Sequence, residues 1–217
     1  IDSNNKKKIL IIQNKALELS MFLSLPAFVA LIIASEEIIS ALFGYGSFSE
    51  KAVINSGNAL FFFGLGLPAF AMIKVFSSFF FANHDTKTPF YISVVSVILN
   101  IFISVMYFNS IGFIIIPIAT TISSWFNSIF LFVFLKKNNF FRFNNVFVER
   151  FFKITIASIL MGVFLKFLIL FFQNQLNYDY HLKLVYLIIC VLLCISFYLL
   201  LSFFIKAFKT EDIKLKY

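Results

Sequence analysis

Six long apolar stretches fill most of this chain, and short polar connections separate them. Each stretch has about the 17 to 25 residues that a helix needs to cross the hydrocarbon core of a bilayer. A soluble domain cannot bury six such segments, because its helices usually keep a polar face toward water. The pattern therefore predicts membrane-spanning helices at Leu19–Phe43, Ala59–Ala82, Phe90–Phe108, Ile111–Leu135, Ile154–Phe172 and Leu184–Ile205.

The composition supports the same fold class. Hydrophobic residues make up 61% of the chain, charged residues make up 13%, and the mean hydropathy is +0.95. Such a chain is stable in lipid if every backbone group bonds within its own helix. We predict an all-α polytopic membrane protein with six transmembrane helices.

The net charge of +8 raises the question of a nucleic-acid partner, which the distribution of charge excludes. If both termini lie inside, fourteen of the 18 basic residues fall on the inner side. Only Lys51 and Lys183 fall outside, and Lys74 and Lys166 lie within spans. This asymmetry is the positive-inside bias that sets orientation, and anionic lipid headgroups are the expected partners of the basic segments.

Turn residues divide the chain further. Gly44–Ser47 is a turn signal that ends the first span, and Asp85–Pro89 predicts a tight inside connection with proline in the first turn of the next helix. Gly64, Gly66 and Pro68 favour a kink or an unwound stretch in the second span. Pro117 predicts the start of the fourth helix, after an interfacial corner at 109–116.

The predicted organisation has five parts. Residues 1–18 form a basic cytoplasmic lead-in, residues 19–135 hold four helices, residues 136–153 form a basic cytoplasmic loop, residues 154–205 form a terminal helix pair, and residues 206–217 form a cytoplasmic tail. The chain opens on Ile1 and has no signal-peptide pattern, which suggests a fragment or a processed chain.

Polar side chains form one stripe on each of two predicted spans. Ser93, Ser96, Asn100 and Ser104 share a face of the third span, and Thr120, Ser124 and Asn127 share a face of the fourth. Such stripes either bond helices together, at about 0.6 to 2 kcal/mol for each hydrogen bond, or line a polar cavity. Bonding between helices accounts for the hydroxyls, and Asn100 and Asn127 are the candidates for a cavity.

Lys74 lies deep in the second span, eight residues from its end at Ala82. A lysine at the centre of a span costs roughly 2.5 to 3.5 kcal/mol and is a functional hypothesis by default. The alternatives for Lys74 are a functional role and a structural ion pair. Lys166 is nearer to a span end and reaches the interface more easily.

Sequence motifs for catalysis are missing from this chain. It has no phosphate-binding loop, and its two histidines, His84 and His181, fall on opposite sides of the membrane. Cys190 and Cys194, four residues apart in the last span, are best explained as packing residues. We therefore expect no catalytic activity, no cofactor and no metal site.

Two segments resemble the signature of the MurJ/MviN family. Leu25-Pro26-Ala27 with the run from Ile38 to Phe48 matches its first block, and Gly66–Phe70, Lys74-Val75, Phe80–Ala82 and Asp85–Pro89 match its second. Order and spacing both fit as far as Asn100, and helix number and loop lengths carry the resemblance further. Glu36 and Glu37 depart from the pattern, because the family usually has a small or proline-containing turn there.

Members of that family are bacterial lipid II flippases of fourteen helices, within the superfamily of multidrug and oligosaccharide-lipid exporters. The resemblance implies that this chain is the C-terminal portion, helices nine to fourteen, in the plasma (inner) membrane. It implies a polyprenyl-pyrophosphate-linked substrate (lipid II), as part of peptidoglycan biosynthesis, and the missing N-terminal helices as a partner. Those helices would hold the arginine-rich cavity, which leaves Lys74 as the cationic position carried over.

In the family the terminal pair helps to form a groove for the long lipid tail, and here Phe164, Lys166 and Phe167 are its candidates. The alternatives are an exporter of another polyprenyl-linked glycan or amphipathic drug, and a non-transporting membrane scaffold.

Overall fold

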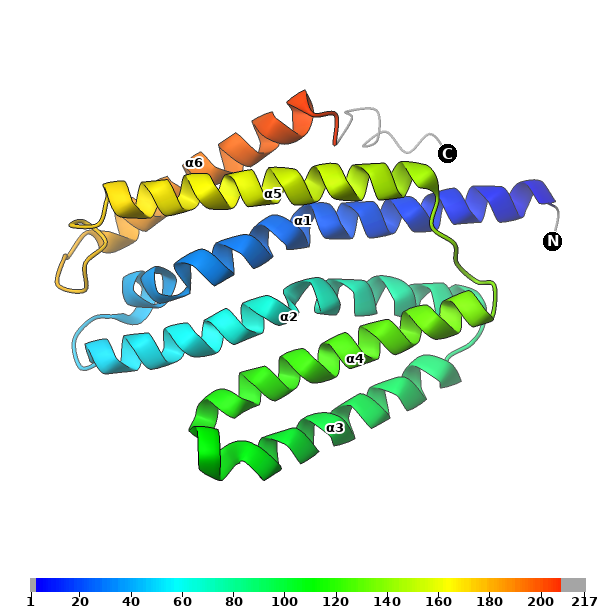
Figure 1. The fold of residues 1–217 in the computed structure, drawn as a ribbon, viewed down its shortest axis with the longest axis horizontal. Helices are drawn as coiled ribbons and strands as arrows, with labels where there is room; N and C mark the ends of the chain where they lie inside the picture. Colours follow the sequence, from blue (N-terminus) through cyan, green and yellow to red (C-terminus); the bar gives the residue numbers. More distant parts are fainter. Residues whose placement is uncertain (1–2, 208–217) are drawn as a thin grey trace. The chain divides into compact units, whose positions relative to one another are not determined.

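A computed structural model describes residues 3–207, and within that range every regular element is a helix. The elements are α1 (Ser3–Phe43), α2 (Glu50–Ala82), α3 (Lys87–Ile111), the short 3₁₀ helix η1 (Gly112–Ile114), α4 (Ile115–Lys137), α5 (Asn145–Phe171) and α6 (Lys183–Phe204) (Figure 1). The prediction of an all-α fold is confirmed. The predicted tail lies outside the described residues from position 208 onward.

Five helical segments of the described chain are long and apolar enough to cross a membrane. One of them, the 51-residue segment Lys87–Lys137, comprises both α3 and α4, because the chain reverses at η1. α3 has 25 residues and α4 has 23, so each is long enough for one crossing. The six predicted spans therefore correspond to these six helices.

Several helices extend beyond the apolar stretches that predicted them. α1 begins at Ser3, so the described part of the predicted lead-in is continuous with the first span, and α2 begins at Glu50 rather than Ala59. The reason is that polarity marks where lipid ends, whereas a helix ends only where its backbone bonding ends. Whether the lead-in lies on a membrane surface stays a prediction.

The helices group into two compact units. The first unit comprises the described part of Ile1–Ser24 together with Leu65–Val148, and the second unit comprises Leu25–Gly64 together with residues 149–207. α1 and α2 contribute one part to each unit, because helices of 41 and 33 residues are about 60 and 50 Å long and meet different neighbours along their length. This grouping differs from the predicted division into 19–135 and 154–205, which follows sequence order.

The glycines of α2 serve close helix packing. A kink or an unwound stretch was expected at Gly64, Gly66 and Pro68. The unwound stretch does not occur, since α2 is helical throughout, and a break in helical φ/ψ falls in α1, at Ala34 (φ −120°, ψ 20°). A Cβ on Gly64 would lie 2.8 Å from Leu31 Cβ, in the second unit. A Cβ on Gly66 would lie 3.0 Å from Thr121 Oγ1, in the first unit.

The predicted turns lie close to their expected positions. α1 ends at Phe43, and Gly46 in the following turn has φ +60°, which glycine adopts without strain. α4 begins at Ile115, two residues before Pro117, so the predicted corner narrows to Gly112–Ile114. Proline fits there because the first turn of a helix lacks internal partners for its backbone donors.

Asp85 begins α3 by accepting a hydrogen bond. The backbone N–H of Thr88 donates to Asp85 Oδ1 over 3.0 Å, one residue before the assigned cap at Thr86. That bond, followed by one from the Thr88 hydroxyl, holds the pKa of the Asp85 carboxyl below its usual value. The predicted tight connection is confirmed, with Pro89 in the first turn of α3.

Candidate functional site

The polar stripes of α3 and α4 meet within the first unit, where the two helices run side by side (Figure 1). Asn100 Nδ2 lies 3.1 Å from Thr120 Oγ1 and 3.3 Å from Ser123 Oγ. Thr120 and Ser123 themselves donate to backbone carbonyls of α4. The Asn100 side chain therefore bonds the two helices together, which is the role expected of the hydroxyls.

Asn127 differs from Asn100 because its side-chain amide oxygen accepts no hydrogen bond from the described residues. Its side chain is buried, and Nδ2 lies 3.4 Å from Ser93 Oγ, at the long limit of a hydrogen bond. Asn127 Oδ1 is buried and has no hydrogen-bond partner in residues 3–207, and the same is true of Ser104 Oγ. An unpaired buried acceptor costs about 1 to 3 kcal/mol, so Asn127 keeps the capacity to bind a further polar group.

Lys74 is exposed on α2 in the first unit. Its backbone carbonyl accepts a hydrogen bond from the Ser78 hydroxyl over 2.8 Å. Its ammonium has no hydrogen bond and no ion pair with any residue of the described chain. If Lys74 has a structural ion pair, its partner lies outside residues 3–207.

The three candidates on α5 have unlike surroundings in the second unit. Phe164 stacks on Phe197 of α6, with ring centroids 4.5 Å apart, so its ring joins the terminal helices. Phe167 is 60% exposed, and Lys166 is exposed beside it. A surface that could contact a lipid tail is therefore formed by Phe167 and Lys166 rather than by Phe164.

Cys190 and Cys194 are free and buried in α6, in keeping with a packing role. Their side chains are 0% and 4% exposed. Across the described part of the chain, no group of three or more His, Cys, Asp and Glu side chains is placed to hold a metal ion.

Lys183 is the polar feature that sequence reasoning missed. The sequence assigned it only to the outer side of the membrane, and the residue is 1% exposed at the start of α6. Its Nζ donates to the carbonyl oxygens of Gly44 and Tyr178, each over 2.6 Å. The ammonium also lies 4.4 Å from the ring centroid of Tyr45 and 4.6 Å from that of Tyr178.

This lysine joins two connections of the second unit. Gly44 follows α1, whereas Tyr178 precedes α6, and the Tyr178 hydroxyl donates to the Phe48 carbonyl over 2.6 Å. Glycine is needed at position 44, because a Cβ there would lie 2.5 Å from Ser40 O and 3.1 Å from Lys183 Nζ. The tyrosines in both connections are the sequence signal that could have indicated a buried cation.

Six helices of membrane length define a multi-pass α-helical membrane protein. A sequence model of the family described as "Lipid II flippase MurJ" matches residues 1–188. The chain therefore belongs to the MurJ lipid II flippase family, which confirms the resemblance and extends it past Asn100 into α6.

Relatives and a solved structure agree with this placement. A "Probable lipid II flippase MurJ" of Rhizobium meliloti is 40% identical over 124 residues, which cover 57% of this chain and 23% of the relative. One of Thermotoga maritima is 31% identical over 194 residues, which cover 89% of this chain and 37% of the relative. The structure "Lipid II flippase MurJ, inward closed conformation" superposes with a TM-score of 0.74 at 25% identity, over 94% of this chain and 41% of that one.

The chain thus spans well under half the length of these relatives. A flippase is a transporter rather than an enzyme, as the sequence predicted.

Proposed function

We propose that the protein to which this chain belongs flips lipid II across the bacterial inner membrane, with both ends of this segment cytoplasmic. The family match over residues 1–188 carries the proposal. The chain covers 41% of the solved flippase. We place this segment at helices nine to fourteen of the complete protein, where the other helices would complete the transport path.

Lys74 is the proposed contact for the pyrophosphate. It is an exposed cation in the middle of a span, and no described residue balances its charge. Such a charge is costly in lipid unless an anion or water compensates it. A substrate phosphate, or a carboxylate elsewhere in the complete protein, supplies that compensation.

Asn100 and Asn127 have separate proposed roles. Asn100 keeps α3 and α4 in register through the hydroxyls of Thr120 and Ser123. Asn127 presents a free amide oxygen, so it is the better candidate for a contact along the transport path.

The terminal pair α5 and α6 is proposed to guide the polyprenyl tail along the surface formed by Phe167 and Lys166. A hydrocarbon chain gains about 0.8 kcal/mol per CH₂ only on leaving water. A tail already in the bilayer therefore gains little, and the groove positions it rather than binding it tightly.

Substitution of Lys74 in the complete protein tests the proposal. In cells depleted of their own flippase, Lys74→Met should stop delivery of lipid II to the outer leaflet, whereas Lys74→Arg should keep part of it. Lys136→Met, an exposed lysine at the end of α4, is the matched control and should transport normally. Normal transport by Lys74→Met at native protein level contradicts the role, and a variant that fails to accumulate indicates a structural ion pair.

A further inference from the structure

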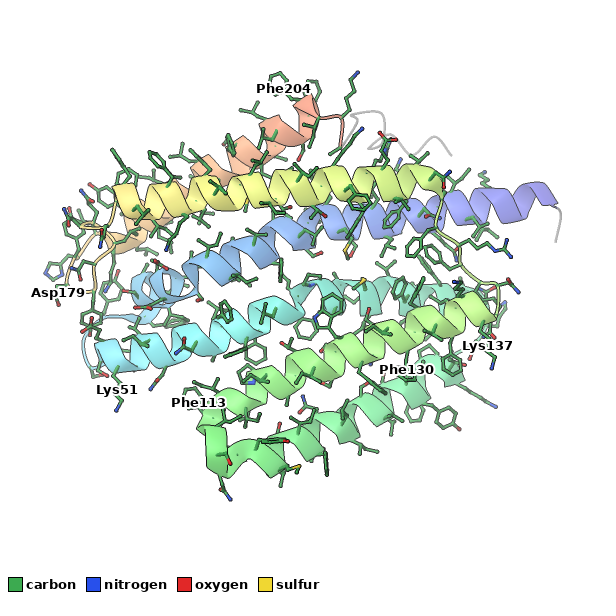
Figure 2. All side chains as sticks on the ribbon, viewed as in Figure 1. Lys51, Phe113, Phe130, Lys137, Asp179 and Phe204 are labelled. Atoms are coloured by element: carbon green, nitrogen blue, oxygen red, sulfur yellow. The ribbon has the colours of Figure 1, made fainter. Side chains whose placement is uncertain are left out.

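A cavity of about 280 Å³ lies within the second unit. Its wall includes Glu36, Glu37 and Ser40 of α1, Glu50 and Val53 of α2, and Ile169 of α5. The segment that joins α5 to α6 contributes the other lining residues, Gln173, Leu176, Asn177 and Tyr178. Figure 2 shows Lys51, next to Glu50, and Asp179, in the α5–α6 connection, at the same end of this unit.

The cavity is strongly acidic. None of its three carboxylates forms an ion pair with a described residue. Lys166 acts electrostatically on Glu37 without pairing with it, and the ammonium of Lys183 is already bonded to two carbonyls. Glu50 is stabilised by its position in the first turn of α2. The helix thus stabilises the negative charge of Glu50. The charges of Glu36 and Glu37 are not both balanced by a positive charge of the described chain.

Ser40 gives the second, independent observation. It is 5% exposed, it lines the cavity, and its Oγ has no hydrogen-bond partner within residues 3–207. Buried hydroxyls are almost always bonded. An unbonded hydroxyl beside unpaired carboxylates indicates that a hydrogen-bond donor of positive charge belongs in the cavity.

The geometry favours an organic cation over a metal ion. The carboxylates do not form a group that could hold a metal ion in the described chain. The wall also contains apolar side chains, Val53 and Ile169, which suit the carbon chain of a ligand. An ammonium group donates several charge-assisted hydrogen bonds to carboxylates.

We propose that this cavity binds a primary ammonium group on a short aliphatic chain. That chemistry occurs in an amino side chain of a peptide and in the headgroup of an amino phospholipid. The proposal rests on the cavity itself and does not require that the protein transports lipid II.

The test uses the complete protein in phosphatidylcholine nanodiscs and n-butylammonium as the probe, with binding measured by saturation-transfer NMR. Tetramethylammonium has the same charge and no N–H donor, so it should bind about tenfold more weakly. Glu37→Gln and Ser40→Ala should each weaken binding of n-butylammonium. Asp179→Asn removes the same charge from an exposed residue outside the cavity and should leave binding unchanged.

Several outcomes overturn the proposal. Equal binding of both cations, or an equal loss in Asp179→Asn, shows attraction to general surface charge. Tighter competition by Na⁺ or Ca²⁺ assigns the cavity to an inorganic ion. If Glu37→Gln fails to fold, normal binding by Ser40→Ala is enough to reject the site.

The source of the ammonium is distinguished by competition. Phosphatidylethanolamine in the nanodisc should displace n-butylammonium if the ligand is a lipid headgroup, and a lysine-containing peptide should displace it if the ligand is a peptide. If neither the lipid nor the peptide displaces n-butylammonium, both sources are rejected.

Discussion

The ammonium of Lys183 donates a 2.6 Å hydrogen bond to the carbonyl of Gly44, across 139 positions of the chain. A second bond to Tyr178 places the same charge in the connection that precedes α6. One side chain therefore fixes both connections of the second unit, and it does so while 1% exposed.

Removal of this cation should destabilise the protein. Lys183→Met keeps much of the stem but leaves the carbonyls of Gly44 and Tyr178 without a donor, at a cost of about 1 to 3 kcal/mol for a buried polar group left unpaired. The melting temperature of the complete protein in detergent should fall. Lys51→Met, which removes an exposed lysine at the same end of the unit (Figure 2), should change the stability by less than about 0.5 kcal/mol. Equal effects of the two substitutions would show that the buried bonds contribute nothing.

The orientation of the chain can be tested by thiol labelling. Ser49, Thr86 and Asn174 are all exposed, so the side of the membrane alone should decide their reactivity. In a Cys190→Ala, Cys194→Ala background, single cysteines at Ser49 and Asn174 should react with an impermeant reagent added outside, and a cysteine at Thr86 should not. Labelling at Thr86 with protection of the other two would reverse the predicted topology.

Contact with the lipid tail should be local to α5. A photo-crosslinking residue at Phe167, which is 60% exposed, should capture polyprenyl lipid above bulk phospholipid in the complete protein. Phe130, an exposed phenylalanine of α4 (Figure 2), is the matched control and should capture phospholipid without enrichment. The same lipid profile at both positions would show that α5 and α6 do not guide the tail.

Stability should depend on the charge of Asp85 at low pH. Its hydrogen bond from the Thr88 backbone lowers the pKa in the folded state below the ordinary value of 3.8. The carboxylate therefore stabilises the fold above that value, and this contribution is lost as the pH falls through the lower pKa of the folded state. Melting temperatures of wild type and Asp85→Asn should differ most near neutral pH, and the difference should shrink as the pH falls below 3.8. A constant difference across that range would mean that the ionised form has no preference for the folded state.

Local residues explain why the helices and turns could be predicted. The six apolar stretches, the turn at Gly46 and the start of α3 after Asp85 each depend on neighbours within a few positions. The motif that ends in Asp85–Pro89 could likewise be recognised from the sequence alone. It indicated the family that the match over residues 1–188 shows.

Predictions of what an individual side chain contacts in the fold were less successful. Gly64 and Gly66 were expected to kink or unwind α2; the helix is not unwound, and the two glycines allow Leu31 and Thr121 to approach it closely. Lys183 was assigned only to the outer side of the membrane, and its burial was not predicted. In both cases the partner lies far away in the sequence, so a local pattern contains no information about it.

The sequence by itself determined that this chain crosses a membrane, where it turns and to which family it belongs, because hydropathy, turn residues and motifs act over short stretches of chain. Only the tertiary structure decided which polar groups are paired and which are not. In the structure, Asn100 is hydrogen-bonded to Thr120 and Ser123. Asn127 Oδ1 and Ser40 Oγ have no hydrogen-bond partner among the described residues. One cavity is lined by Glu36, Glu37 and Glu50. The physical reason is that satisfaction of a buried polar group depends on distances of about 3 Å between atoms, and only packing of distant segments sets those distances.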